Sequence, residues 1–552
     1  MLKPIKRLFT RNKGNKGSKS SGINKYNPQT QLDSRSPQTL DDSQNQQSEV
    51  IYGQKYINIK LTKNLKENLA TIKGAMNNNY DIKTKEFKLG GRGVYGAVVY
   101  IPSLADEDFV LNHIVNPLMI QSSLILDRED AISFDTIKDT MIDAEYINEA
   151  ESLDQILFSV MSGDTFLSVQ GYPKGLIIST KGYVGRQVSE PQLEPSVKGS
   201  QEGFTEILQD NIGLLRRRIR DPNLVFEVYK VGQRTQMEVV IAYLRDVADQ
   251  GVAIETAGRL SSLDVDGIQG TAELGLYITD NPNSIFPLYQ VTERPDRVAR
   301  GLMEGRVAIF MEGGAEALVV PATMPILLQS ADDYYENWIV SSLLRLLRYG
   351  GMLISIFLPS LYIALAGHHP GMLPTKLVLT ITGARTGVPF PGFLEAVIMG
   401  ATLELLQEAS IRLPRVIGQA VSIVGGLVIG QAAVQAGLVG PIMVIIIGVT
   451  AIGSFVVTDY SLGLATRVLR IPFMILALTL GGFGLALGAL VLITYMADLE
   501  SFGIRYIKPL SPYRIRDLKQ TILKARDASH MNRPAFLNTA DVQRQTKQRR
   551  GK

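Results

Sequence analysis

Three glutamates interrupt a largely apolar stretch, GFLEAVIMGATLELLQEASIRLP, at residues 392–414. They are Glu395, Glu404 and Glu408. Glu404 and Glu408 lie one helical turn apart and share a face, and Arg412, one turn further on, is placed to pair with Glu408. Ionisable side chains at membrane depth are costly, so they usually meet water, one another or a charged partner. Two interpretations follow: an interfacial helix with solvated carboxylates, or a helix whose glutamates line an aqueous path for cations.

The next stretch, VIGQAVSIVGGLVIGQAAVQAGLV at 416–439, combines small residues with carboxamides. Glycine or serine recurs at every fourth position, a spacing that lets membrane helices pack backbone to backbone. The glutamines run beside this stripe, and they either form hydrogen bonds across helices or contact ions directly. We favour packing over ion contact. The predicted packing residues are Gly418, Ser422, Gly426, Gly430, Gln419, Gln431 and Gln435.

Other residue patterns that could carry chemistry are weaker. A nominal dinucleotide fingerprint, Gly91-x-Gly93-x-x-Gly96, precedes a predicted strand instead of following one, so we reject it. His368 and His369 could bind metal or sense pH, but adjacent side chains diverge and no carboxylate is near in sequence, so we predict a loop without a special role. The chain has no cysteine, which excludes a disulfide framework and thiolate chemistry. We expect no enzyme activity, no cofactor and no metal site.

The elements that must position the glutamates are membrane helices. Of the 552 residues 45% are hydrophobic and 20% charged, which suggests polar and apolar segments in series. After Arg348 three long runs carry no charge, and the middle run is twice the length of one span and is broken by GLVGP. We predict four spans and an amphipathic or re-entrant helix at 392–411. The spans are predicted at about 349–367, 416–436, 441–458 and 472–497.

Basic residues predict the orientation of these spans, because Lys and Arg favour the cytoplasmic side. Arg345 and Arg348 precede the first span, and a run of Lys and Arg follows the last. Both flanks are therefore predicted to be cytoplasmic, which requires an even number of spans. Four spans meet this requirement but place four arginines outside. Full insertion of 392–411 would bring these arginines inside but would place the basic C-terminal tail outside. The four are Arg412, Arg415, Arg467 and Arg470.

The part before the membrane helices alternates β-branched runs with helical stretches, as a soluble α/β domain does. A Pro-, Ser- and Glu-rich linker at 188–203 divides it into two subdomains, 56–195 and 196–340. Residues 1–55 are predicted to be a disordered basic tail, either simply solvated or in contact with anionic lipid headgroups. The fold class predicted is thus an α/β soluble domain, an all-α polytopic membrane domain at 341–500, and a disordered basic cytoplasmic tail at 501–552.

Several long motifs occur in order along the chain. They are EGFTEILQDNIGLLRRRIRDPNL from 202, TERPDRVARGLMEGRVAIF from 292, DDYYENWIVSSLLRLLRY from 332, PFPGFLEA at 389–396, which contains Glu395, and RLPRVIGQAVSIVGGLVIGQAAVQAGLV from 412. Together they resemble one family, the A subunits of GerA-type spore germinant receptors. The resemblance covers about 56–512, and the basic tails are not part of it.

The resemblance implies a multi-pass protein of the spore inner (cytoplasmic) membrane, with its N-terminal domain and C-terminal tail in the cytoplasm. It implies two partners, a transporter-like B subunit thought to bind the nutrient and a lipoprotein C subunit. It further implies a homo-oligomer, proposed to be a pentamer, that acts as a nutrient-gated channel for monovalent cations and triggers germination. The alternative is a non-conducting membrane scaffold that assembles the other subunits. The formal net charge of +4 gives no reason to expect a nucleic-acid partner.

Overall fold

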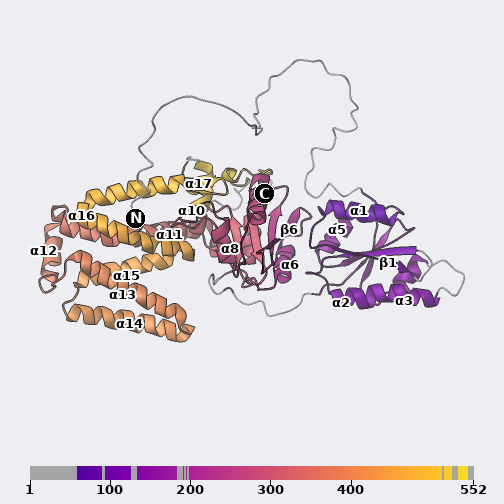
Figure 1. Ribbon diagram of the computed structural model, residues 1–552, viewed down its shortest axis with the longest axis horizontal. Coiled ribbons are helices and arrows are strands. Elements are labelled where there is room, and N and C mark those ends of the chain that lie inside the picture. Colours follow the sequence, from indigo (N-terminus) through magenta and orange to yellow (C-terminus); the bar gives the residue numbers. More distant parts are fainter. Residues whose placement is uncertain are drawn as a thin grey trace, which may run out of the picture. The chain divides into compact units, whose positions relative to one another are not determined.

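The computed structural model describes residues 59–89, 94–125, 133–182, 191, 194, 198–511, 515–524 and 532–544. The predicted disordered tail, 1–55, lies outside these residues. Within them the chain forms two five-stranded antiparallel sheets with helices on their faces, followed by a series of longer helices (Figure 1). The two sheets lie at 83–178 and 224–320, inside the ranges predicted for the two subdomains.

The first sheet is sandwiched between two layers of helix. Its order is β1-β2-β4-β5-β3. Successive side chains of β2 point to opposite faces: Ala97 and Val99 pack with α1 and α5, and Val98 and Tyr100 with α3 and the π-helical turn before it. The strands are β1 Lys83–Leu89, β2 Val94–Tyr100, β3 Ile147–Ala150, β4 Thr165–Val169 and β5 Gly175–Ile178, and the helices α1 Leu65–Ala75, α2 Glu107–Phe109, α3 Asn116–Ile125 and α5 Leu153–Met161.

The second sheet repeats this architecture with the order β6-β7-β9-β10-β8. Val240 and Ala242 of β7 pack with α6 and α9, whereas Val239 and Ile241 pack with α7 and α8. Pro295 begins α9, as its fixed φ favours. The strands are β6 Leu224–Val231, β7 Met237–Leu244, β8 Gln290–Thr292, β9 Val307–Met311 and β10 Ala317–Val320, and the helices α6 Leu208–Arg218, α7 Gln250–Ser261, α8 Thr271–Ile278 and α9 Pro295–Met303.

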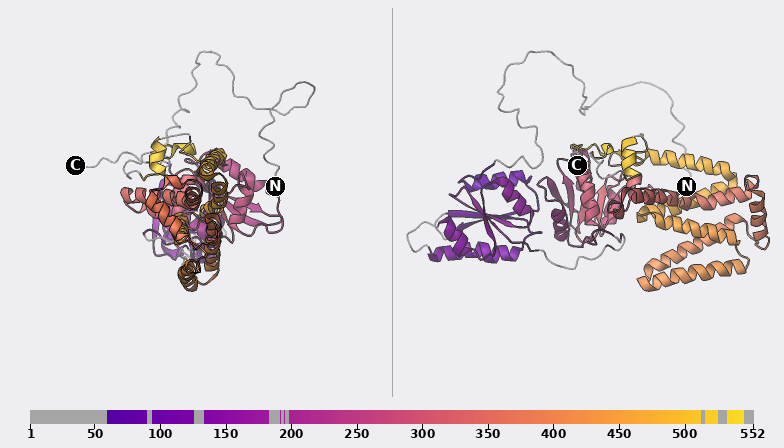
Figure 2. Two further views of the ribbon diagram at one scale, coloured as in Figure 1. Left: turned by 90° about the vertical axis from the view of Figure 1, so that its left-hand side faces the viewer. Right: turned by 180° about the vertical axis from the view of Figure 1, so that it is seen from behind.

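The second half of the described chain is helical. Two of its helices, α11 and α16, are long and apolar enough to cross a membrane, and α15 is a shorter apolar helix. The helices α13 and α14 pack against each other as a hairpin (Figure 2). The bounds are α10 Met324–Leu327, α11 Trp338–Gly367, α12 Thr375–Ala384, α13 Gly392–Arg412, α14 Arg415–Gln435, α15 Pro441–Val456, α16 Tyr460–Asp498 and α17 Ile515–Thr521.

The long helix α16 folds back on itself at Gly481, whose φ of 61° and ψ of −138° are not helical. A Cβ added at Gly484 would lie 2.3 Å from the carbonyl oxygen of Leu476, and one at Gly488 would lie 2.8 Å from the ring of Phe473. In a straight helix these pairs would be separated by about 12 and 22 Å along the axis. The two arms of α16 therefore run antiparallel.

This reversal corrects the prediction of a single span at 472–497, because the turn lies inside that range. The arms are 460–480 and 482–498, and both pack against α11. Glycine adopts a positive φ without steric cost, so two adjacent glycines at 481–482 permit a reversal that the uncharged sequence conceals. The apolar run at 471–497 looked like one span because it contains no charge at the turn.

Hydrogen bonds identify the helix ends that meet the second subdomain. The Thr458 hydroxyl, between α15 and α16, donates to the carbonyl of Leu327 at 2.8 Å. The Ser501 hydroxyl, just after α16, donates to the carbonyl of Leu288 at 2.6 Å and accepts from the Ala322 amide at 3.0 Å. The start of α11, the α15–α16 turn and the end of α16 therefore all lie at the α/β domain.

The described part of the C-terminal region is folded, which corrects its prediction as a disordered tail. The Ala540 amide donates to the carbonyl of Val247 at 3.1 Å, and the Arg533 side chain donates to the carbonyl of Met303 at 2.8 Å. Phe536 is buried against the residues that follow α16. Basic composition alone predicted disorder here, but the apolar residues within 532–544 give the segment a surface to bury.

Asp221, in the loop before β6, gives a testable pH dependence. The pKa of its carboxyl is raised to about 7, chiefly by burial; the hydrogen bond from the Asn223 amide opposes the shift, and the nearby charge of Asp246 adds to it. Because this pKa lies above its unfolded value, the folded state loses stability as pH rises from about 4 to 7. Asp221→Asn should raise the thermal midpoint at pH 8 by a few degrees, at about 2–4 °C per kcal/mol, and change it little at pH 4. The exposed Asp266→Asn should shift neither midpoint; equal midpoints for Asp221→Asn and wild type at pH 8 would contradict this assignment.

Candidate pore helix and its arginine partners

Glu395, in the first turn of α13, is fully buried. One carboxylate oxygen lies 3.2 Å from Nη2 of Arg385, and the other accepts a hydrogen bond of 2.8 Å from the amide of Gly440. The carboxylate therefore ties the start of α13 to the residue that precedes α15. This placement assigns Glu395 to holding helix ends together, and its sequence-based interpretation as a pore-lining residue is revised accordingly.

Glu404 lies in the middle of α13 and faces two arginines of α16. Its carboxylate oxygens lie 3.4 Å from Nη1 of Arg467 and 3.6 Å from Nη1 of Arg470, and its side chain is 40% exposed. Arg470 is buried and also donates to the carbonyl of Ser355 at 3.0 Å and to the hydroxyl of Ser454 at 3.1 Å. One guanidinium thus connects α11, α13, α15 and α16.

Glu408 pairs with Arg412, as the spacing of four residues predicts, with a shortest distance of 2.6 Å. Both side chains are well exposed, at 60% and 77%. An exposed pair of this kind stabilises a helix by only about 0.3–0.5 kcal/mol. Its carboxylate is therefore free to exchange partners, and together with Glu404 it remains a candidate for contact with ions.

The small residues of α14 divide between two surroundings. A Cβ at Gly418 would lie 2.5 Å from the carbonyl oxygen of Ser410, and one at Gly425 would lie 2.8 Å from Leu406, so these two glycines face α13. They are seven residues apart, which returns to the same face of a helix more closely than a repeat of four does. The structure thus uses Gly425 for the contact with α13, a residue that the predicted stripe omits.

The other predicted packing residues do not share that contact. Gly430 is buried, and a Cβ there would lie 3.5 Å from Val444 of α15. A Cβ at Gly426 would meet open space, and Gln431 and Gln435 are exposed within this chain. The side chains of Gln419 and Ser422 lie outside the described ones. The predicted hydrogen bonds of the glutamines across helices remain a prediction, which a neighbouring chain would have to fulfil.

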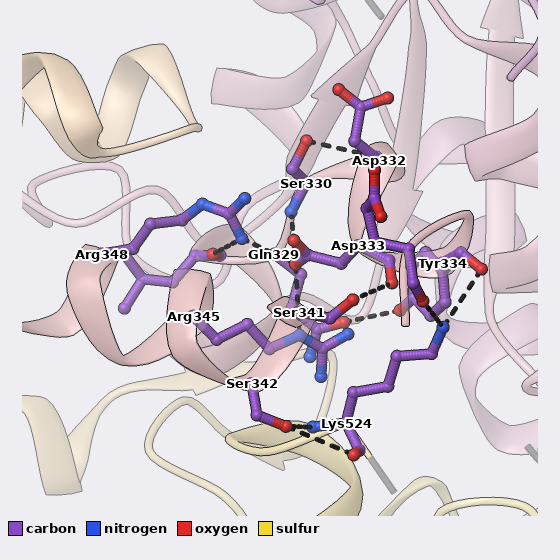
Figure 3. A network of polar contacts seen from close by, with 12 residues as sticks. Gln329, Ser330, Asp332, Asp333, Tyr334, Ser341, Ser342, Arg345, Arg348 and Lys524 are labelled. Carbon is purple, nitrogen blue, oxygen red and sulfur yellow. Dashed lines mark hydrogen bonds and ion pairs between the residues drawn. The ribbon is translucent and has the colours of Figure 1, made fainter. Parts of the chain in front are cut away.

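A buried polar network that the sequence did not indicate joins α11 to the α/β domain (Figure 3). Asp333 is fully buried, and one of its oxygens lies 3.1 Å from Nε of Arg345 and 2.6 Å from Nη1 of Arg348. Arg345 also donates to the carbonyl of Thr521 at 3.1 Å. The two arginines were interpreted as charges flanking a span; the acidic pair that precedes them at 332–333 was the signal that they have a partner.

The C-terminal segment completes this network. The ammonium of Lys524 donates to the carbonyls of Tyr334 and Glu336 at 3.2 and 2.8 Å, and its amide donates to the Ser342 hydroxyl at 3.0 Å (Figure 3). The carbonyls of a short turn, the first turns of α11 and the chain after α17 are thereby held together.

Comparison with known proteins identifies the family. Residues 70–536 match the family model described as Bacillus/Clostridium GerA spore germination protein. The chain belongs to the GerA family. This match confirms the resemblance found in the sequence. The chain is therefore a member of a family of spore germination proteins.

Two relatives align over nearly their whole length. Spore germination protein B1 of Bacillus subtilis (strain 168) is 38% identical over 487 residues, which are 88% of this chain and 100% of the relative. Spore germination protein GerLA of Bacillus cereus is 35% identical over 492 residues, which are 89% and 99% of the two chains. A crystal structure of the N-terminal domain of the A subunit of the Bacillus megaterium spore germinant receptor GerK3 is 29% identical, with a TM-score of 0.35, and covers 48% of this chain and 98% of that one.

Proposed function

We propose that this chain is the A subunit of a nutrient germinant receptor and forms a nutrient-gated channel for monovalent cations in the spore inner membrane. The observation that carries the proposal is the placement of Glu404 and Glu408. Both are partly exposed carboxylates on a largely apolar helix, beside helices able to cross a membrane. The chain acts by conformational change and conduction and has no catalytic role.

The helix ends support a membrane domain of six crossings in place of the predicted four. α11 leaves the α/β domain, and α15 returns to it at Thr458. Glu395 places the start of α13 beside Gly440 at the start of α15, so α13 runs in the same direction as α15 and α14 runs opposite. The two arms of α16 add one crossing each way. α13 and α14, with 21 residues each, are about 31 Å long, and α15, with 16, is about 24 Å.

Six crossings keep the even parity that the basic flanks require. They also avoid the disadvantage of the four-span arrangement, which places four arginines outside. Arg412 ends α13 and Arg415 begins α14, at the end that points toward the α/β domain. Arg467 and Arg470 lie in the first arm of α16, which starts at that domain. All four arginines then lie toward the cytoplasm, as the positive-inside rule favours. The hairpin in α16 is what permits full insertion of α13.

The pairing of Glu404 has a consequence for conduction. A carboxylate shared by two guanidinium groups presents little free negative charge to a passing cation. Cation flow past Glu404 therefore requires its ion pairs with Arg467 and Arg470 to loosen when the channel opens. These pairs are long, at 3.4 and 3.6 Å, and one side of the carboxylate is exposed, so little rearrangement is needed. We propose that this arrangement, with Glu404 paired, is the closed state of the channel.

The partners proposed are those of the family: a transporter-like B subunit that binds the nutrient, a lipoprotein C subunit, and further copies of this chain in a pentamer. The exposed side of α14 supports contact between copies. It presents Gly426, Gln431 and Gln435 together with Leu427 and Val428, all exposed within one chain. Apolar residues with small and carboxamide neighbours form the kind of surface that membrane helices use to associate.

Substitutions at two adjacent glycines of α14 distinguish an effect on folding from an effect on assembly. Gly425→Leu should lower the amount and thermal stability of the chain, because the new side chain meets Leu406 of α13. Gly426→Leu should leave the amount of chain unchanged and reduce the oligomeric fraction, because its side chain enters space that is open in one copy. Size-exclusion chromatography with light scattering measures both quantities. Wild-type assembly of Gly426→Leu would remove this face from the interface between copies.

A scaffold that holds the B and C subunits without conducting is the second candidate, and the network around Asp333 favours it to the extent that it fixes the α/β domain to α11. Purified protein in liposomes distinguishes the two. A channel releases potassium when the Glu404 pairs are weakened by Arg467→Gln, whereas a scaffold leaves the liposomes tight with wild type and variant alike. Lys376→Gln, on α12, is the control for loss of one positive charge.

A further inference from the structure

Two adjacent imidazoles meet the reversal in α16. Nε2 of His368 lies 2.8 Å from the carbonyl oxygen of Leu478, and the amide of Gly482 lies 3.1 Å from Nε2 of His369. The ring centroids are 6.3 Å apart. A Cβ added at Gly481 would lie 2.8 Å from His368, so the turn and the imidazoles are in close contact. The side chains diverge, as expected of neighbours, and each reaches a different backbone group of the turn.

The two groups that they contact are the two halves of one missing helical bond. In a continuous helix the amide of Gly482 would donate to the carbonyl of Leu478, four residues earlier. The turn at Gly481 breaks that bond and leaves this amide and this carbonyl without each other, and unpaired backbone groups away from water are costly. His368 donates to the carbonyl of Leu478, and His369 accepts from the amide of Gly482. The two imidazoles together therefore replace the lost backbone hydrogen bond.

The partners fix the protonation of each ring nitrogen. A carbonyl oxygen can only accept, so Nε2 of His368 carries a proton, in either the neutral or the charged imidazole. A backbone amide can only donate, so Nε2 of His369 is bare, which requires the neutral imidazole. Protonation of His369 would set an N–H against the N–H of Gly482 and end their hydrogen bond. Protonation of His368 leaves its bond intact. Of the two hydrogen bonds, protonation therefore ends only the one between His369 and Gly482.

The neighbouring segments contribute no competing charge. The stretches 349–375 and 471–497, which supply the later part of α11, its following turn and most of α16, contain no carboxylate, lysine or arginine. Their titratable side chains are the two histidines and the phenols of Tyr349, Tyr362 and Tyr495. Lys376, at the start of α12, is the nearest cation along the chain. Of these groups, imidazole is the one that changes charge between about pH 5 and 8.

We propose that His369 is a proton-controlled clasp on the α16 hairpin. The neutral imidazole closes the turn at Gly481 by accepting from Gly482, and protonation of the imidazole removes this hydrogen bond and releases the turn, so that the two arms separate. The clasp lies at the end of α11 opposite the Asp333 network, on the side of the helices away from the α/β domain. It acts on the hairpin itself and does not depend on whether the oligomer conducts ions.

A distance between the two arms tests the clasp directly. The chain has no cysteine, so spin labels can be attached at Ile475→Cys and Leu487→Cys, two exposed positions on opposite arms. Pulsed electron spin resonance on the full-length protein in detergent gives their distance distribution at about pH 8 and pH 5.5. We expect a narrow peak at the higher pH, and its loss with a shift to longer distances at the lower pH.

Two matched variants assign the effect. His369→Gln keeps an oxygen that accepts from Gly482 at either pH, so its narrow peak should persist at low pH. His368→Gln keeps an N–H donor for Leu478 and leaves His369 in place, so it should respond to pH as the parent does. The same distribution at both pH values in the parent overturns the proposal without any variant. A response to pH that survives in His369→Gln overturns it as well, because another group must then be responsible.

Discussion

Asp333→Asn should remove most of the folded full-length protein. The substitution keeps the size of the side chain and deletes the one negative charge between Arg345 and Arg348, both of which are buried. Breaking a buried ion pair by removing one partner costs about 3–5 kcal/mol, because the remaining charge is left without compensation. Two guanidinium groups lose their partner here, and a folded domain is stable by only about 5–15 kcal/mol.

The measurement is the yield of monodisperse protein in detergent together with the emission of Trp338. This is the one tryptophan of the chain and begins α11, so its fluorescence reports on this junction. We expect a red shift and a large loss of yield for Asp333→Asn. Asp332→Asn, which removes the neighbouring and partly exposed carboxylate, is the matched control and should stay near wild type. If the two variants behaved alike, the network would not be what holds α11 to the α/β domain.

The second large effect is expected at Gly481. Its φ of 61° with ψ of −138° belongs to a region that residues with a Cβ avoid, and a Cβ there would lie 2.8 Å from His368. Gly481→Ala should therefore prevent the tight reversal, at a cost on the order of 1–3 kcal/mol for the backbone alone. If α16 continues straight, the chain after 482 is carried to the wrong side of the membrane. Its contacts with the α/β domain, such as Ser501 with Leu288, are then lost.

Accessibility of a cysteine placed at Glu500 reads out this change. In sealed, oriented vesicles a membrane-impermeant thiol reagent should label Glu500→Cys from the same side as a cysteine in the α/β domain at Glu86. Adding Gly481→Ala should expose position 500 to the opposite side or remove it with degraded protein. Gly463→Ala, in the same helix with open space for its Cβ, should leave the labelling unchanged. Labelling of Glu500→Cys from one side in both backgrounds would argue against the hairpin.

The sequence allowed the positions of the helices to be predicted better than their connections. Uncharged runs and the GLVGP break located α11, α14 and α15, because exclusion of charge is a local property. The reversal in α16 was missed since a turn at the membrane surface normally carries polar residues, and here Gly481 and Gly482 rely on two histidines from another segment. The even parity of the spans stays a prediction, because it depends on the basic flanks alone.

In the candidate site, too, a local contact could be predicted and contacts between distant segments could not. The spacing of four residues predicted the pair of Glu408 with Arg412, which is a local contact. The partners of Glu395 and Glu404 come from 10 residues before and from another helix, and no periodicity along α13 indicates them. Sequence patterns specify which face a side chain occupies, whereas these ion pairs depend on which helices become neighbours. The chemistry of Glu395 as a tether could therefore not be foreseen.

Potassium release from spores tests the channel most directly. Spores carrying Glu404→Gln with Glu408→Gln should release potassium more slowly after addition of the nutrient, at an unchanged level of the protein. Glu86→Gln with Glu145→Gln removes the same charge from two exposed sites of the α/β domain and should leave release unaffected. Release by the α13 variant at the rate of wild-type spores, with normal protein level, would contradict the assignment of this helix to the cation path.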